Sequence, residues 1–202
     1  MNFINQEREN IKIYKRLYKR YGNSFKSLDW GSKKKQILRF EILSEIGNLN
    51  KKKILDVGCG FGDFNSWLKK NKKNVNYFGI DIVPEMIIEA KKKHKKSFFY
   101  NGSFLRNKDI GNQRFDYVFA SGIFTFNRKK GNSILKKTIL KMWKISKKGI
   151  AFNCLNSKNE FKTSNEYTAN PNKVYNFCKK LSKKIKLNES YLPSDFTIYL
   201  KK

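Results

Sequence analysis

One stretch decides the fold: Ile54-Leu55-Asp56-Val57-Gly58-Cys59-Gly60-Phe61-Gly62-Asp63-Phe64. It opens with an apolar run, a pattern that predicts a buried strand of a parallel sheet. Glycines follow at 58, 60 and 62, and segment 63–70 then has apolar residues at helical spacing. Glycines suit such a turn because it needs φ angles that a Cβ disfavours and because a bare backbone lets a ligand approach closely. Strand, turn and helix together predict the first half of a nucleotide-binding βαβ unit.

The spacing Gly-x-Gly-x-Gly differs from the Gly-x-Gly-x-x-Gly of dinucleotide enzymes, in which a pyrophosphate lies on the helix N-terminus. Asp56 ends the strand, two residues before Gly58. A carboxylate there would repel a pyrophosphate and suits a cationic ligand, such as one with an ammonium or sulfonium group. The alternative is a generic glycine-rich turn in an α/β protein that binds nothing.

The segment 56–62 resembles the first motif of the class I S-adenosylmethionine-dependent methyltransferases. The resemblance implies that Asp56 and the glycine loop, including Gly58, Cys59 and Gly60, hold the methionine end of the cofactor S-adenosylmethionine. It also implies a Rossmann-like sheet of seven strands that ends in an antiparallel hairpin.

The second motif of that family is an acidic residue after the second strand, and Asp81 matches it, 21 residues beyond Gly60. The resemblance implies that this carboxylate accepts hydrogen bonds from both ribose hydroxyls of the cofactor and that the neighbouring Ile82 also contacts the cofactor. The alternative is a surface Asp that caps the helix beginning at Pro84.

Further cofactor contacts are expected where the third and fourth strands end. Ser103 stands where the family often has an Asp or Asn that accepts a hydrogen bond from the adenine amino group. The Ser103 hydroxyl is expected to accept the same hydrogen bond, but more weakly than those side chains. Phe104 either stacks on the adenine or belongs to the core. Ser121 matches the fourth motif by position, near the methyl group. Arg39 lies 19 residues before Gly58. Ubiquinone-pathway O-methyltransferases, which this chain resembles there, have an Arg about as far before the glycine loop that helps bind the cofactor, so Arg39 is implied to bind the cofactor carboxylate. The alternative is a surface Arg.

Strands are expected at 54–57, 75–80, 97–100, 115–120 and 149–154, alternating with helices, and two short strands near 185–187 and 196–200 follow. This order predicts a doubly wound, mostly parallel sheet with helices on both faces and a terminal antiparallel hairpin. Two helices precede it: 3–21, and one capped by Ser32. We expect a single domain, with cover helices in 1–48 and a cofactor-binding core in 49–202.

The 202 residues are enough to bury a core. No run approaches the ~18–20 apolar residues of a membrane span, and the polar N-terminus does not resemble a secretory signal. The three cysteines are far apart without metal-ligand spacing, so neither disulfides nor a metal site is expected, and a reducing, cytoplasmic setting fits best.

The net charge of +29 has two interpretations. One is a polyanionic partner such as nucleic acid. The other is biased amino-acid usage, because 38 of the 45 cations are Lys, whereas nucleic-acid readers favour Arg. The spread of the lysines along the chain favours the second.

A methyltransferase that acts on a small molecule is therefore expected, with Asn153, Asn156 and Tyr167 as candidate acceptor contacts. A nucleic-acid methyltransferase is the first alternative, although the fourth motif, Ala120-Ser121-Gly122-Ile123, lacks the Pro-Pro-aromatic pattern of adenine enzymes. A cofactor-binding subunit without catalysis is the second, supported only by Ser103. His94 lies in a lysine-rich helix end that is expected to be exposed and far from the site, and is not expected to act as a base.

Overall fold

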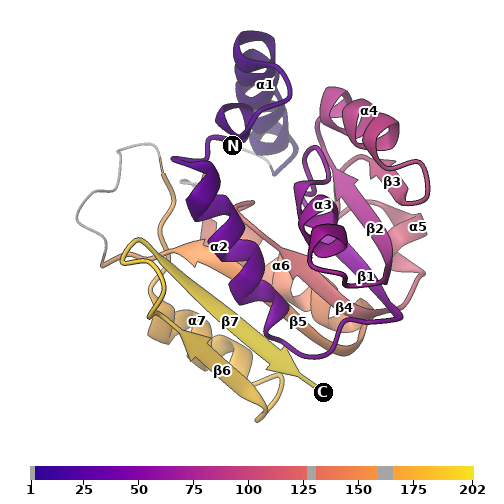
Figure 1. Cartoon of the computed structure of the whole chain (residues 1–202). Helices are drawn as coiled ribbons and strands as arrows, with labels where there is room; N and C mark the ends of the chain where they lie inside the picture. The colour runs from indigo at the N-terminus through magenta and orange to yellow at the C-terminus, as the bar shows by residue number, and fades with distance from the viewer. Residues whose placement is uncertain (1–2, 127–130, 159–165) are drawn as a thin grey trace.

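The computed structural model describes residues 3–126, 131–158 and 166–202. Their core is one seven-stranded sheet with the order β3-β2-β1-β4-β5-β7-β6 (Figure 1). Strands β1 to β5 pair in parallel, and β7 pairs antiparallel with both β5 and β6, so β7 alone of the seven runs the other way. The strands are β1 (Lys52–Val57), β2 (Val75–Asp81), β3 (Phe98–Asn101), β4 (Phe115–Ala120), β5 (Ser146–Leu155), β6 (Ile185–Asn188) and β7 (Asp195–Lys201). The predicted fold class, including the terminal hairpin, is confirmed.

Helices cover both faces of the sheet, as the apolar strands require. One face packs on α2 (Lys33–Ser44), α3 (Asp63–Lys70) and α4 (Pro84–Lys93), through side chains such as Leu43, Phe64 and Ile87. The other packs on α6 (Gly131–Ile145) and α7 (Pro171–Lys179), through Leu135 and Cys178 among others. A four-residue helix, α5 (Lys108–Gly111), lies in the segment before β4.

Local sequence signals begin the helices where they were expected. The Ser32 hydroxyl accepts a hydrogen bond from the backbone N–H of Lys35 (3.2 Å), which satisfies one of the free donors at the start of α2. Pro84 opens α4, where its missing N–H costs nothing. Strand β5 is longer than predicted because pairing continues from Ser146 to Leu155.

The N-terminal helix α1 (Phe3–Tyr21) lies across the end of the sheet at which the parallel strands finish (Figure 1). A short 3-10 helix, η1 (Phe25–Leu28), occupies part of a segment expected to be a plain loop. Tyr14 and Tyr18 pack against Phe61 and Met86. Helix α1 therefore covers the edge of the sheet where ligands bind in such folds. No helix in the described ranges is both long and apolar enough to traverse a lipid bilayer.

Candidate functional site

The glycine turn after β1 has the backbone shape that the sequence predicts. Gly58, Gly60 and Gly62 have φ angles of +72°, +51° and +73°. A Cβ on Gly58 would lie 2.1 Å from Cγ2 of Ile123, in the turn after β4. No side chain fits there without moving Ile123, so glycine is required both for the backbone conformation and for the close approach of the two turns.

Asp81 connects the ends of β1 and β2. Its carboxylate accepts hydrogen bonds from the backbone N–H groups of Gly60 and Val83, both at 2.9 Å. Burial raises the pKa of Asp81, while these backbone donors lower it. A carboxylate has about four lone-pair positions, so acceptor capacity remains for ligand hydroxyls. The bonds to the backbone fix the carboxylate at the cavity wall.

Asp56 is the second carboxylate at this edge, and only 4% of its surface is exposed. Burial raises its pKa to about 7, although the hydroxyl of Tyr77, which donates a 2.5 Å hydrogen bond to Oδ2, lowers it. The negative charge of Asp81 raises it further. A cation bound nearby would favour the ionised form of Asp56, so this position is suited to a cationic ligand.

A cavity of about 150 Å³ lies at this edge, under α1. Most of the residues that the sequence predicted for the cofactor line it: Asp56, Gly58, Cys59, Gly60, Asp81, Ile82, Phe104 and Ser121. Trp30, which the sequence suggests as part of a substrate lid, and Gln36 also line it. Side chains that sequence reasoning missed come from α1: Glu7, Asn10 and Tyr14. Only a helical periodicity marked these elements, and periodicity does not reveal which face meets a cavity.

Ser103 does not line the cavity, but Gly102 and Phe104 on either side of it do. Its hydroxyl is buried and has no hydrogen-bond partner among the described residues. A buried polar atom without a partner is costly, and a ligand with a polar group at this position would satisfy it.

Ser121 and Gly122 form the turn after β4, and Asn153 on β5 holds that turn. The Asn153 amide donates to the Ser121 hydroxyl (3.1 Å) and accepts from the backbone N–H of Gly122 (2.9 Å). The sequence suggested Asn153 as an acceptor contact, and it does line a second cavity, described below. The hydrogen bonds of the Asn153 side chain, however, are made with the turn, so the structure gives this side chain a role in positioning the turn.

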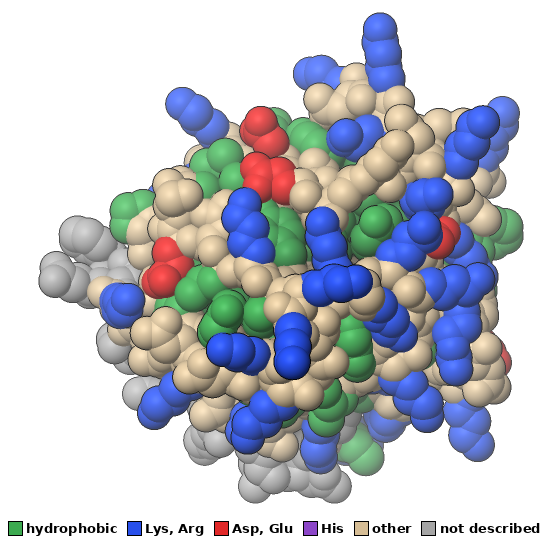
Figure 2. All heavy atoms as spheres, turned by 90° about the horizontal axis from the view of Figure 1, so that it is seen from below, with side chains coloured by type: hydrophobic (Ala, Val, Ile, Leu, Met, Phe, Trp, Pro, Cys, Tyr) green, Lys and Arg blue, Asp and Glu red, His purple; other side chains and the backbone are tan. Residues whose placement is uncertain are grey.

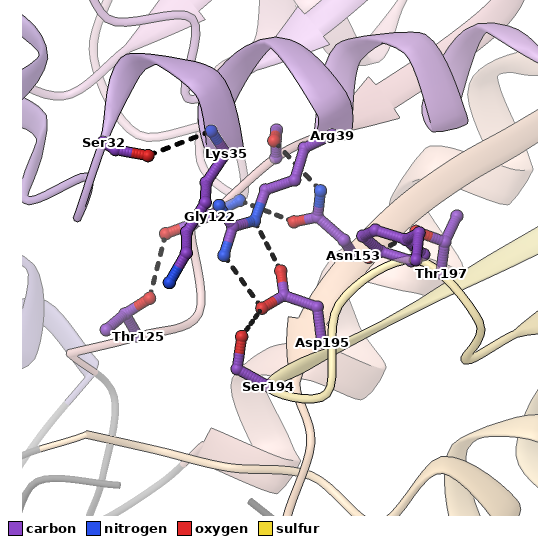
Figure 3. A network of polar contacts seen from close by, with 11 residues as sticks. Ser32, Lys35, Arg39, Gly122, Thr125, Asn153, Ser194, Asp195 and Thr197 are labelled. Atoms are coloured by element: carbon purple, nitrogen blue, oxygen red, sulfur yellow. Dashed lines mark hydrogen bonds and ion pairs between the residues drawn. The ribbon is translucent and has the colours of Figure 1, made fainter. Parts of the chain in front are cut away.

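Arg39 has a different place from the one expected. It does not line the first cavity; its guanidinium pairs with Asp195 at the start of β7 through two hydrogen bonds, of 2.5 and 2.8 Å (Figure 3). The Ser194 hydroxyl donates to the same carboxylate (2.7 Å), and the guanidinium lies 4.6 Å from the ring centroid of Trp30. Two of the five N–H donors of Arg39 are thus used by Asp195, and the side chain lies outside the first cavity. Spacing along the chain could not reveal a partner 156 residues away.

A second cavity, of about 170 Å³, adjoins the first. The two share Tyr14, Leu28, Trp30 and Gly122 as wall residues. A Cβ on Gly122 would lie 2.8 Å from Cη2 of Trp30, so the glycine lets the indole pack on the turn. Trp30 therefore stands between the two spaces.

The second cavity is more polar than the first. Asp29, with a left-handed φ of +56°, lines it together with Lys35, Arg39, Asn153 and Glu166, among others. Partial burial raises the pKa of Asp29, and the nearby negative charge of Glu166 raises it further. A non-glycine residue in this conformation is a feature often seen at functional sites.

Three other expectations need correction or refinement. His94 is buried, not exposed: 4% of its surface is accessible, and it packs beside Gly62 and contacts the Ser66 hydroxyl (3.2 Å). Burial lowers its pKa to about 4. Neither Asn156, which donates to Glu189, nor Tyr167, which donates to Asn132, lines the second cavity.

The first cavity has features that fit S-adenosylmethionine. Two carboxylates flank a turn of bare backbone, and the Phe104 side chain lies on the cavity wall. Asp56 and the glycine turn suit a cationic methionine end, Asp81 suits a ribose, and the ring of Phe104 suits an adenine.

Comparisons with known proteins identify the family of the chain. A family model described as a methyltransferase domain matches residues 48–193. A putative methyltransferase of Mycobacterium tuberculosis is 30% identical over 156 residues, which are 74% of this chain and 92% of that protein. A tRNA (guanine-N(7)-)-methyltransferase of Ruminiclostridium cellulolyticum is 40% identical over 48 residues, 24% of this chain and 20% of the relative.

Solved structures show the same fold. Magnesium protoporphyrin IX methyltransferase from Synechocystis PCC 6803, with bound S-adenosylhomocysteine, has a TM-score of 0.65 at 12% identity, over 96% of this chain and 94% of that chain. An S-adenosylmethionine-dependent methyltransferase from Archaeoglobus fulgidus has a TM-score of 0.65 at 16% identity, over 85% and 95%. The chain belongs to the methyltransferase-domain family and is a class I S-adenosylmethionine-dependent methyltransferase.

Proposed function

We propose that this methyltransferase acts on a small molecule that binds in the second cavity. The observation that carries the proposal is the shared wall: Trp30, Tyr14 and Gly122 line both cavities, so a molecule in the second lies next to one in the first. A partly open space of about 170 Å³ suits a small acceptor or the end of a larger one.

The residues proposed to hold the cofactor are Asp56, Gly58, Gly60 and Asp81, with Phe104 at the adenine. When bound, S-adenosylmethionine supplies an electrophilic methyl group on a sulfonium whose leaving group is neutral, so no acid is needed to protonate it. The chain then contributes mainly proximity and orientation. Trp30 and the turn at Gly122 fix where an acceptor atom meets the methyl group.

A hydroxyl or amine acceptor must lose a proton as its new bond to carbon forms. Asp29 is the proposed recipient. Its carboxylate lines the second cavity, and its raised pKa makes it a better proton acceptor than an ordinary Asp. It lies close enough to Tyr14, on the shared wall, for its charge to raise the pKa of that phenol as well.

Label transfer tests the proposal. The enzyme is incubated with methyl-tritiated S-adenosylmethionine and either the fraction below 3 kDa or the total RNA of the source organism. Label is expected in the small-molecule fraction, with turnover reduced at least tenfold in Asp29→Asn while cofactor affinity is retained. Label in RNA alone would contradict the proposal and support the second candidate.

That second candidate is an RNA methyltransferase. The charge of +29 and the short match to a tRNA methyltransferase favour it. The carboxylates of Asp29 and Glu166 at the second cavity argue against an RNA acceptor, because they would repel a phosphate backbone that approaches there.

A further inference from the structure

Lysines and one arginine gather at the end of the sheet opposite the cofactor cavity. They occupy the segments 51–53, 72–73, 114, 147–148, 183–184 and 201–202, in which every residue is Lys or Arg. We call these segments the basic row. They precede or open β1, β2, β4, β5 and β6, and they close β7, which runs the other way. The topology therefore brings all of them to one edge.

Backbone hydrogen bonds connect the segments across the sheet. The N–H of Lys51 donates to Asn74, just after segment 72–73 (2.6 Å). Lys202 donates to the carbonyl of Lys148 (3.0 Å), and Lys201 donates to that of Lys184 (2.9 Å). With neighbouring strands ~4.8 Å apart, the five steps from β2 to β6 make a line ~24 Å long. This is the length of about seven phosphates along one strand of a nucleic acid.

Acidic residues are sparse along this line. The acid nearest to the row in sequence is Asp116, whose carboxylate accepts the backbone N–H of Lys53 (2.9 Å). The cations are close enough to repel one another: burial lowers the pKa of Lys53, and the charge of Lys147 lowers it further. Figure 2, which views the molecule from below, shows Lys and Arg side chains over most of that face and few acidic ones.

Biased amino-acid usage explains a high number of lysines. It does not explain why lysines and one arginine stand at the starts of five strands and at the finish of β7, all at one end of the sheet, with few acidic residues among them. We propose that the basic row binds the phosphate backbone of a nucleic acid. The row follows the end of the sheet through five strand-to-strand steps, and such an extended run of cations suits a linear polyanion. Because the row lies at the end of the sheet opposite the cofactor cavity, the inference holds whether or not the methyl acceptor is a small molecule.

Two variants of equal net charge test position against total charge. The row variant replaces Lys52, Lys148, Lys183 and Lys201 with Gln, and the control variant replaces Lys19, Lys34, Lys91 and Lys137 with Gln. None of these eight side chains has a hydrogen bond or ion pair with another described residue. A third variant, with Arg at the four row positions, preserves the charge.

Binding of 20-nucleotide oligo(U) and oligo(dT) is measured from 50 to 200 mM salt. Each lost phosphate contact lowers the slope of log K against log salt by ~0.7 for a single strand, so the row variant should lose about 2 to 3 units of slope and at least tenfold in affinity. The control and Arg variants should stay within threefold of the wild type. Binding of either oligonucleotide through the row supports the proposal.

If the row and control variants lose oligonucleotide affinity equally, the attraction is diffuse and the proposal is overturned. The absence of any oligonucleotide binding would also overturn it. So would tighter binding to phosphatidylserine vesicles than to either oligonucleotide. If the row variant does not fold, lysine acetylation of the wild type gives the answer. Oligo(U) must then protect the row lysines and leave Lys19 and Lys34 reactive; uniform protection would contradict the proposal. Titration of S-adenosylmethionine into every variant should give the wild-type affinity, so that a loss of oligonucleotide binding can be distinguished from a loss of the cofactor site.

Discussion

The guanidinium of Arg39 on α2 holds both carboxylate oxygens of Asp195 on β7, at 2.5 and 2.8 Å. Both side chains are buried, at 7% and 2% exposure. The pair therefore fastens the N-terminal helices to the strand that separates β5 from the edge of the sheet, and it forms part of the wall of the second cavity.

Replacing Arg39 with Ala should lower the free energy of unfolding by about 3 to 5 kcal/mol, because Asp195 would remain buried without its partner. Urea unfolding measures the loss. Lys33→Ala, which removes a cation half exposed at 3.6 Å from Asp63, is the matched control and should cost about 1 kcal/mol or less. Cofactor affinity should change little in either variant; a large loss in Arg39→Ala alone would return Arg39 to the cofactor site.

Asp56 should make the ligand-free protein less stable as the pH rises. Its pKa is about 7 in the folded chain and near 3.8 when unfolded. Between these values the folded state holds the proton and the unfolded state does not, so stability is fully present at low pH and is lost toward pH 7, by about 4 kcal/mol. Urea unfolding from pH 4 to 8 should find Asp56→Asn more stable than wild type above pH 7. A difference between the two that does not vary with pH would contradict this.

Tyr77→Phe should move that pH dependence upward. The Tyr77 hydroxyl donates to Asp56 and lowers its pKa, so without it the midpoint should rise above pH 7. Tyr167→Phe is the control, since the Tyr167 hydroxyl donates instead to Asn132, which has no ionisable group. The same unfolding series reports both midpoints, and a shift common to both variants would count against the assignment to Asp56.

Gly122→Ala should destabilise the protein by about 1 to 3 kcal/mol, because φ is +69° and the new Cβ would lie 2.8 Å from Trp30. Gly31→Ala is the control, since no atom lies within 4 Å of its Cβ position and its φ is not left-handed. Thermal and urea unfolding should therefore separate the two glycines. If Gly122→Ala has no effect, the contact between the indole and the turn is not tight.

The sequence could predict the features that depend on neighbouring residues. The cap at Ser32, Pro84 at the start of α4, and the turn around Gly58 all follow from local backbone chemistry. The parallel pairing of β1 to β5 followed from the alternation of apolar runs and helices, because parallel strands need helical crossovers.

The features that sequence could not predict depend on distant partners. Arg39 is indistinguishable along the chain from a surface Arg until β7 brings Asp195 beside it. His94, among lysines, appears exposed, but the turn at Gly62 leaves room for its ring. The second cavity requires the loop at Trp30 and the segment after β5 to meet.

The central claim is that Asp56, Asp81 and the bare backbone at Gly58 hold S-adenosylmethionine. Calorimetric titration of the cofactor into wild type, Gly58→Ala and the control Gly31→Ala tests it most directly. We predict one site of micromolar or tighter affinity, about −8 kcal/mol or better, in wild type and Gly31→Ala. We predict at least tenfold weaker binding in Gly58→Ala, whose Cβ would lie 2.1 Å from Ile123. No heat with the wild type, or equal affinity in all three proteins, would contradict the claim.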